Sequence, residues 1–335
     1  MSKIIPPGKL PLELLDKLLG SYENTDTRVL VGPRVGEDAT VIEFGDICLV
    51  AKSDPITFAT DDIGYYAIHV NANDIATMGA EPRWFLTTLL LPEKSTDESL
   101  VESVFSSIHG AASEAGITVC GGHTEITVGL DRPVVIGLML GEVKKDDLIQ
   151  SVNLKVGDAL LLTKGLGIEA TAILSRERSH QLTKQGVGAD VLQRGREYLR
   201  NPGISILREA RIACQTGDVH AMRDPTEGGV ATALRELAMA ASGGLSLRYE
   251  ALFASEDTRL ICSQLGLDPL GVISSGALLI GVAVDDSENV RDAIRSAGIA
   301  CEIIGHVEDQ TFGLRILESG KWHDLPSFDR DEIGR

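Results

Sequence analysis

Residues 70–80 of the chain read VNANDIATMGA, and the rest of the sequence is interpreted outward from them. Apolar and small residues recur there at the spacing of one helix face, and Gly79 is a typical helix end, so the stretch predicts the last turns of a helix. Asn71 and Asp74 lie three residues apart and predict a polar stripe at the edge of that helix. The pair suits a cation, although on this helix alone a solvated polar face is the simpler interpretation.

The bulk composition indicates a soluble globular protein of about two domains, because domains average ~150 residues and this chain has 335. Hydrophobic residues make up 43% of it, which is ample for buried cores. A formal net charge of −18 argues against binding to nucleic acid or to an anionic membrane. Five scattered cysteines without a CxxC pair are typical of a reduced, cytoplasmic protein, and no apolar run approaches the ~20 residues of a membrane span.

Strands and helices alternate along the chain and predict two α/β domains, residues 1–153 and residues 154–335. In the first domain, a capping box from Ser95 to Glu98 predicts the start of a long helix. In the second domain, the polar segment 176–187 predicts a mobile loop between helices.

Three aspartates fall where we expect elements to end. Asp38 lies in a loop before a strand, Asp54 follows the strand expected at 47–52, and Asp74 is near the end of its helix. Each has an ordinary explanation as a turn former, a cap or an ion-pair partner. Together they are the hard oxygen ligands of a Mg²⁺ ion that completes its shell with phosphate oxygens.

Two glycine-rich segments predict close backbone approach to a ligand. GGHT at 121–124 follows a short strand, and DPTEGG at 224–229 opens a helix whose free N–H groups would suit an anion. The alternatives are a tight turn in the first segment and a plain cap by Asp224 or Thr226 in the second. His123 is a ligand, a general base or an ordinary loop histidine. The chain has no Walker A motif, and no GxGxxG follows its first strand.

In combination these motifs resemble the aminoimidazole ribonucleotide (AIR) synthetase superfamily, the PurM-like proteins, and within it the HypE family of hydrogenase maturation proteins. They follow one another over roughly residues 30–285, and only together are they specific. The matching segments are GEDATV at 36–41, NDIATMGA at 73–80, GGHT at 121–124, MRDPTEGGVA at 222–231, and LDPL at 267–270 followed by Ser275-Gly276.

The resemblance implies a two-domain α/β PurM-like fold in which the N-terminal domains of two chains pair into a dimeric β-barrel. It implies that ATP and Mg²⁺ are cofactors, bound in a cleft of that assembly. By position, the metal ligands would be Asp38, Asp54 and Asp74, the other cofactor contacts would be Asn73, Gly121, Gly122, Thr226, Gly228 and Gly229, and the catalytic residues would be Asp74, His123 and Asp224.

Two features differ from the family pattern. HypE proteins end in a cysteine that receives a carbamoyl group, whereas this sequence ends DEIGR and its last cysteine is Cys301, in a predicted strand. We therefore do not expect that reaction on the chain's own tail. His123 also stands where the family has an acid, which would weaken a Mg²⁺ site unless Glu125 compensates.

The sequence thus predicts an enzyme that uses ATP and Mg²⁺ to phosphorylate an oxygen of a small-molecule acceptor, with dehydration or ring closure as an open second step. It predicts a cytoplasmic homodimer without nucleic-acid or membrane partners. One alternative is a phosphotransferase similar to thiamine-monophosphate kinase. Another is a catalytically reduced nucleotide-binding scaffold, which His123 and the missing cysteine favour and the three aspartates disfavour.

Overall fold

The computed structural model describes residues 5, 10, 12–21, 25–33, 37–57 and 61–334. These residues form two compact units. The N-terminal unit comprises the described residues of Asn24–Gly32 and Asp38–Leu148, and the C-terminal unit comprises those of Met1–Glu23, Pro33–Glu37 and Ile149–Arg335. The boundary that we expect between residues 153 and 154 stays a prediction.

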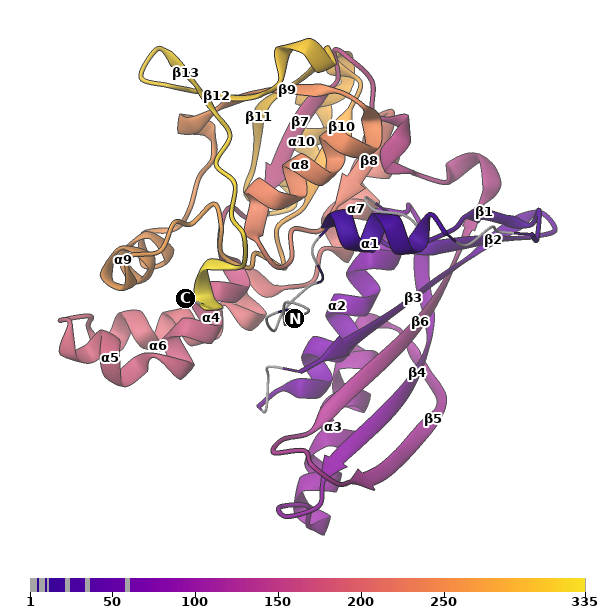
Figure 1. Cartoon of the computed structure of the whole chain (residues 1–335), viewed down its shortest axis with the longest axis vertical. Helices are drawn as coiled ribbons and strands as arrows, with labels where there is room; N and C mark the ends of the chain where they lie inside the picture. Colours follow the sequence, from indigo (N-terminus) through magenta and orange to yellow (C-terminus); the bar gives the residue numbers. More distant parts are fainter. Residues whose placement is uncertain are drawn as a thin grey trace, which may run out of the picture. The chain divides into compact units, whose positions relative to one another are not determined.

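The N-terminal unit is built on one six-stranded sheet (Figure 1). Its strands lie in the order β1 (Val29–Val31), β2 (Thr40–Phe44), β3 (Ile47–Ile56), β6 (Val134–Lys144), β4 (Glu81–Pro92) and β5 (Thr118–Thr127). All neighbours pair antiparallel except β4 and β5, which run parallel. The sheet is therefore mixed, and β5 forms one of its edges.

Two helices pack together in the N-terminal unit, α2 (Ile63–Thr77) and α3 (Glu98–Ala115). Gly64 lets them approach closely, because a Cβ there would lie 2.4 Å from the backbone nitrogen of Ile108. Gly79 adopts a positive φ of 73° just beyond α2, as the sequence predicts. The edge stripe expected on α2 is wrong, since Asn71 and Asp74 are buried between α3 and the sheet.

Some ends of helices and strands in this unit differ from those that the sequence predicts. α3 is capped by Asp97, whose side chain accepts a hydrogen bond from Leu100 N at 2.8 Å, and Ser95 is not its cap. The glycines at 121–122 lie inside β5 and do not form a turn.

The C-terminal unit contains a seven-stranded mixed sheet (Figure 1). Its order is β13 (Lys321–Asp324), β12 (Leu314–Glu318), β9 (Gly244–Arg248), β11 (Cys301–Glu308), β7 (Ala159–Thr163), β10 (Leu279–Val282) and β8 (Val219–Arg223). Its helices are α1 (Leu12–Leu19), α4 (Ile168–Glu177), α5 (Ser179–Lys184), α6 (Ala189–Glu197), α7 (Leu207–Thr216), α8 (Gly229–Ala241), α9 (Glu256–Leu265) and α10 (Ser287–Ser296).

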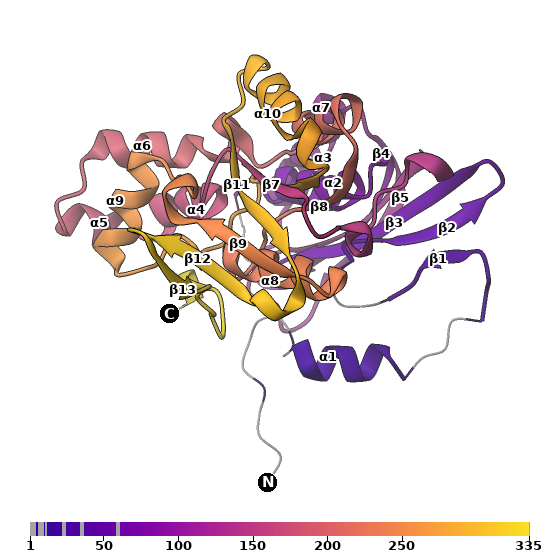
Figure 2. The same ribbon diagram turned by 90° about the horizontal axis from the view of Figure 1, so that it is seen from above.

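The helices of this unit form separate layers. Leu160 and Leu162 of β7 share one apolar core with Leu234 of α8. α10 packs on β7 and β11 and lies beside α7 (Figure 2). α4, α5, α6 and α9 form a second core, to which Leu182 of α5 contributes. The segment 176–187, expected to be a mobile loop, thus contains a helix.

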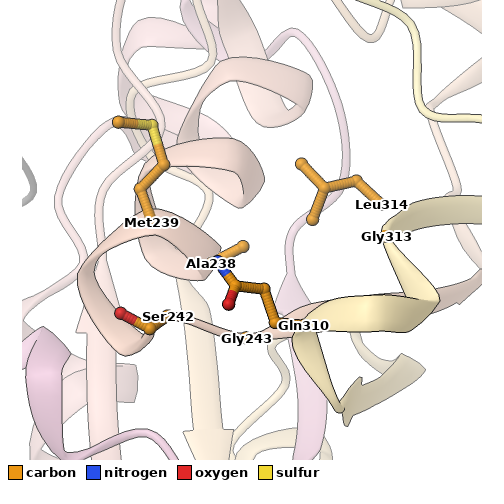
Figure 3. Close-up of a pocket in the computed structure, with 7 residues that line it drawn as sticks. All are labelled: Ala238, Met239, Ser242, Gly243, Gln310, Gly313 and Leu314. Atoms are coloured by element: carbon orange, nitrogen blue, oxygen red, sulfur yellow. The ribbon is translucent and has the colours of Figure 1, made fainter.

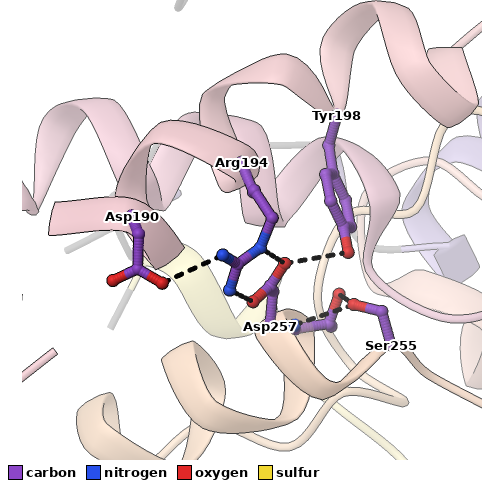
Figure 4. Close-up of polar contacts among 6 residues, drawn as sticks. Asp190, Arg194, Tyr198, Ser255 and Asp257 are labelled. Atoms are coloured by element: carbon purple, nitrogen blue, oxygen red, sulfur yellow. Dashed lines mark hydrogen bonds and ion pairs between the residues drawn. The ribbon is translucent and has the colours of Figure 1, made fainter. Parts of the chain in front are cut away.

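An ion-pair network at the surface links α6 and α9 (Figure 4). Arg194 of α6 donates through Nη2 and Nε to the two carboxylate oxygens of Asp257 on α9, at 2.8 Å and 3.1 Å. Its Nη1 reaches Asp190 one turn earlier, at 3.0 Å. No helix within the described ranges has the length and apolarity to cross a bilayer.

Candidate functional site

A lysine and two aspartates meet between β3 and α2. Lys52 and Asp54 are two residues apart on β3, so their side chains leave the same face of the sheet. α2 packs against β3 and brings Asp74 to them. Lys52 Nζ lies 3.1 Å from Asp74 Oδ2 and 3.5 Å from Asp54 Oδ2. With Asp38, whose charge acts on the same ammonium group, they form what we call the acid–lysine cluster.

The electrostatics of this cluster favour a charged lysine. Burial by itself lowers the pKa of Lys52, but the negative charges of Asp74, Asp54 and Asp38 outweigh it and raise that pKa above its ordinary value. The ammonium of Lys52 is therefore expected to be charged at neutral pH.

Asn71 fixes the position of Asp54. Its Oδ1 accepts a hydrogen bond from the Asp54 backbone nitrogen at 2.9 Å, and its Nδ2 donates to Ala67 O one turn earlier on α2 at 2.9 Å. Gly137 on β6 makes room for the amide, because a Cβ there would lie 2.4 Å from Asn71 Nδ2. The backbone that carries Asp54 is thus held by a fully buried side chain.

The predicted ligand residues are more enclosed than the sequence suggests. Asp54 lies inside β3, which continues beyond the expected strand end, and Asp74 is buried in the last turn of α2. Asn73 is buried on the same helix. Gly36, the first residue of its motif, lies outside the described residues. The expectation that Asp54 follows its strand is therefore wrong, whereas Asp74 lies near the end of its helix as expected.

The carboxylates of Asp38, Asp54 and Asp74 are chemically suitable for Mg²⁺, which prefers oxygen ligands. In the described part of the chain, no three acidic, histidine or cysteine side chains are gathered closely enough to hold a metal ion by themselves. The donor set therefore fits a cation that brings much of its shell with it, as a nucleotide-bound Mg²⁺ does.

β5 lies across the sheet from these residues. The register runs from Asp54 on β3 through Gly137 and Thr87 to Gly122 on β5. Three strand spacings of ~4.8 Å place β5 roughly 14 Å from β3. Within one chain, the structure does not bring His123 to the acid–lysine cluster.

Gly122 has a clear steric reason to be glycine, because a Cβ would lie 1.9 Å from the carbonyl oxygen of Thr87. Gly121 has no such neighbour and faces open space apart from one leucine methyl at 3.9 Å. His123 is exposed, and its Nε2 lies 3.4 Å from Glu125 Oε2. The roles of Gly121, Gly122 and His123 stay predictions.

The predicted site residues of the C-terminal unit lie in the turn between β8 and α8. Asp224 is buried, and Thr226 accepts a hydrogen bond from Gly229 N through its backbone oxygen at 3.0 Å. Gly228, with a φ of 82°, is the N-cap residue, so neither Asp224 nor Thr226 takes that position. Gly228 N donates to the carboxylate of Asp331 at 2.7 Å. An anion that binds this N–H group has to displace Asp331.

A buried glutamate lies close to this turn. Burial raises the pKa of Glu169, on α4, to about 8; the Ser275 hydroxyl opposes that shift, and the charges of Glu227, Asp224 and Asp331 add to it. Glu169 Oε2 finds no hydrogen-bond partner among the described residues. Its carboxyl group is therefore mainly protonated at neutral pH.

Cys301 is enclosed at the start of β11 and is only 1% exposed. Burial raises the pKa of its thiol to about 12, so the reactive thiolate is disfavoured. This agrees with the expectation that Cys301 is not an acceptor of a transferred group.

A pocket of the C-terminal unit has no titratable side chain in its lining (Figure 3). It lies beside the end of α8 and is lined by Ala238, Met239, Ser242, Gly243, Gln310, Gly313 and Leu314. Its chemistry does not match that of the acidic groups above.

Two charged residues near these sites, Lys52 and Glu169, were not predicted from the sequence. For Lys52 the signal was its i, i+2 spacing to Asp54, which only matters if β3 extends past residue 52. For Glu169 the signal was a carboxylate in the first turn of an otherwise apolar helix start, directly after the glycine turn that ends at Gly167.

Comparison with known proteins gives matches along most of the chain. Residues 36–143 match the N-terminal domain of the AIR synthase related proteins, and residues 155–316 match their C-terminal domain. A putative hydrogenase expression/formation protein of Methanocaldococcus jannaschii is 30% identical over 317 residues, which cover 92% of this chain and 91% of that protein. The carbamoyl dehydratase HypE of Escherichia coli K12 is 30% identical over 284 residues, 80% of each chain.

Among solved structures, the hydrogenase maturation protein HypE in complex with ATP superimposes with a TM-score of 0.72 at 25% identity, covering 93% of this chain and 90% of that one. The predicted two-domain PurM-like α/β fold is thus confirmed, whereas the dimeric barrel stays a prediction. The curated relatives include enzymes, as the motifs predict. The chain belongs to the AIR synthase-related family of enzymes.

Proposed function

We propose that this protein transfers the γ-phosphoryl group of ATP to an oxygen of a small molecule and requires Mg²⁺. The observation that carries the proposal is the acid–lysine cluster, in which the buried carboxylate of Asp74 and the half-buried carboxylate of Asp54 both lie beside the ammonium group of Lys52. A relative of the same fold, the hydrogenase maturation protein HypE, has been solved in complex with ATP. Together they support a nucleotide phosphate site in the N-terminal unit.

Phosphoryl transfer needs little covalent help from a protein. It needs the phosphate held in line with its acceptor and its charge compensated. When bound, Mg²⁺ supplies positive charge at the phosphate oxygens, and Asp38, Asp54 and Asp74 would hold it. Asn71 fixes the backbone of Asp54, and Lys52 adds a positive charge beside the carboxylates.

In the C-terminal unit, Thr226, Gly228 and Gly229 remain our candidates for contacts with the nucleotide, and Asp224 remains a candidate catalytic residue. The turn is tight, since a Cβ on Gly229 would lie 2.5 Å from the backbone oxygen of Leu270. These residues can therefore contact a ligand mainly through backbone groups.

We further propose a cytoplasmic homodimer. β5 is an edge strand whose residues are largely exposed, and Ile126 on it is 62% exposed. An exposed edge with apolar side chains is a ready surface for pairing with a second copy. All five cysteines are free, as expected in a reducing compartment.

The test is ADP release from Mg·ATP in the presence of pooled hydroxyl-bearing metabolites. Asp74→Asn is expected to lower the turnover about 100-fold or more, because a charge-compensating group is lost. Asp146→Asn, an exposed acid of the same unit, is the matched control and is expected to keep full turnover. Equal turnover in wild type and Asp74→Asn would remove Asp74 from the mechanism.

A further inference from the structure

Lys52 lies on a face of β3 whose other side chains are mostly buried. β3 alternates between two faces, and Lys52 is on the face that also carries Cys48, Val50 and Ile56, which are at most 9% exposed. Its own side chain is 22% exposed, and that of its partner Asp74 is 5% exposed. A buried ion pair seldom stabilises a fold more than apolar packing would, so fold stability alone does not account for the charge of Lys52.

The ammonium group of Lys52 lies beside one carboxylate oxygen of Asp54 and one of Asp74. Lys52 Nζ is 3.1 Å from an oxygen of Asp74 and 3.5 Å from an oxygen of Asp54. A second Mg²⁺ ion on those same two oxygens, in addition to the one that the three aspartates would hold, needs contacts of about 2.0–2.1 Å and would compete with the ammonium for them. Two cations in that gap would also repel one another strongly in a partly buried setting.

The net charge of the acid–lysine cluster also argues against a second divalent cation. Asp38, Asp54 and Asp74 contribute three negative charges and Lys52 contributes one positive charge. The remaining two negative charges are balanced by one divalent cation. Without Lys52, the same three carboxylates would have charge enough for a second cation in the presence of a nucleotide.

We propose that Lys52 is a built-in cation that replaces one divalent metal ion at the Asp54–Asp74 pair. The protein then takes up a single divalent cation with each nucleotide. This inference rests on the proposed function, because it takes the cluster to be the site of metal-bound ATP. Lys52 is a specificity-determining residue that sets the number of metal ions at this site.

The experiment counts metal ions and does not depend on turnover. The full-length protein is equilibrated by dialysis against Mn²⁺ and a saturating non-hydrolysable ATP analogue, and the excess Mn²⁺ on the protein side is counted by electron paramagnetic resonance after acid release. Wild type is expected to bind about one Mn²⁺ per chain, and Lys52→Met about two. Lys145→Met removes an exposed lysine that pairs with Glu43 in the same unit, and it is expected to bind as wild type does.

The outcomes separate the two proposals. Two Mn²⁺ ions per chain in wild type, or one in both wild type and Lys52→Met, overturns the role of Lys52 and leaves the metal–nucleotide site intact. No Mn²⁺ binding in either protein overturns the proposed function itself. Circular dichroism checks the fold of each variant, and Lys52→Gln replaces Lys52→Met if the latter does not fold. The wild-type count tests the inference in every case.

Discussion

At the scale of single residues, buried charge distinguishes the two acidic regions of the chain. In the N-terminal unit, the carboxylates of Asp54 and Asp74 lie beside the ammonium group of Lys52. In the C-terminal unit, Glu169 has acidic neighbours and stays largely protonated. The first arrangement suits a cation, and the second suits a group that exchanges a proton or donates a hydrogen bond.

Glu169 should give folding stability a measurable pH dependence. Its pKa rises from an ordinary 4.5 to about 8 in the folded chain, so the folded state binds the proton more tightly than the unfolded state. The contribution is fully present below about pH 4.5 and is lost as the pH rises toward about 8, at up to about 1.4 kcal/mol per pH unit. We expect Glu169→Gln to remove this slope in urea unfolding measured from pH 5 to pH 8.

The difference between wild type and variant isolates this one group, because all other titrations are shared. Glu177→Gln, an exposed change on the same helix, should leave the slope unaltered. Parallel stability curves for wild type and Glu169→Gln would show that the Glu169 carboxyl is not protonated in the folded chain.

At the scale of elements, the contact between β6 and α2 positions the candidate site. Gly137 on β6 leaves space for Asn71 on α2, and Asn71 holds the backbone of Asp54 on β3. Three elements that are distant in sequence are thereby joined through one amide side chain. A small residue at position 137 is therefore needed for the site as well as for the packing of α2 on β6.

Gly137→Ala tests that dependence. The added methyl group would lie 2.4 Å from Asn71 Nδ2, and overpacking of this kind typically costs about 1–3 kcal/mol. We expect a lower midpoint of thermal unfolding and weaker ATP binding, because the backbone of Asp54 moves with Asn71.

Gly110→Ala on α3 is the control, since no neighbouring atom lies within 4 Å of the place that a Cβ would take there. Alanine at this position should stabilise the helix by about 0.5–1 kcal/mol. If Gly137→Ala bound ATP as tightly as Gly110→Ala does, Asn71 would not be coupled to the site.

Elements with strong local patterns could be predicted from the sequence, and those that depend on distant partners could not. The start of α3 was expected within a few residues of its observed place, because a capping pattern at 95–98 marks it. β5 was misread because its glycines suggest a turn, while pairing with β4 keeps them extended. α5 is a short polar helix that depends on burial of Leu182 in a core formed by other helices.

The candidate site, too, could be predicted from the sequence only in part. Asp38, Asp54 and Asp74 could be proposed from motifs, because each lies in a short segment with a recognisable pattern. The burial of Asp74 and the lysine partner of Asp54 and Asp74 could not, because these depend on how far β3 extends and on the packing of α2 against it.

At the scale of the whole molecule, the net negative charge of the chain opposes the binding of ATP. The chain carries a formal net charge of −18, and ATP is itself a polyanion. The two repel each other at long range, so tight binding needs positive charge concentrated at the phosphates. Lys52 supplies part of it, and a divalent cation would supply the rest.

The most direct test is calorimetric titration of ATP into the wild-type protein with Mg²⁺ and with EDTA, repeated with Asp74→Asn. We predict that EDTA weakens ATP binding by at least about tenfold, which corresponds to about 1.4 kcal/mol, and that Asp74→Asn weakens the binding seen with Mg²⁺ to a similar extent. ATP binding of the same affinity with Mg²⁺, with EDTA and in Asp74→Asn would contradict a metal–nucleotide site at the acid–lysine cluster.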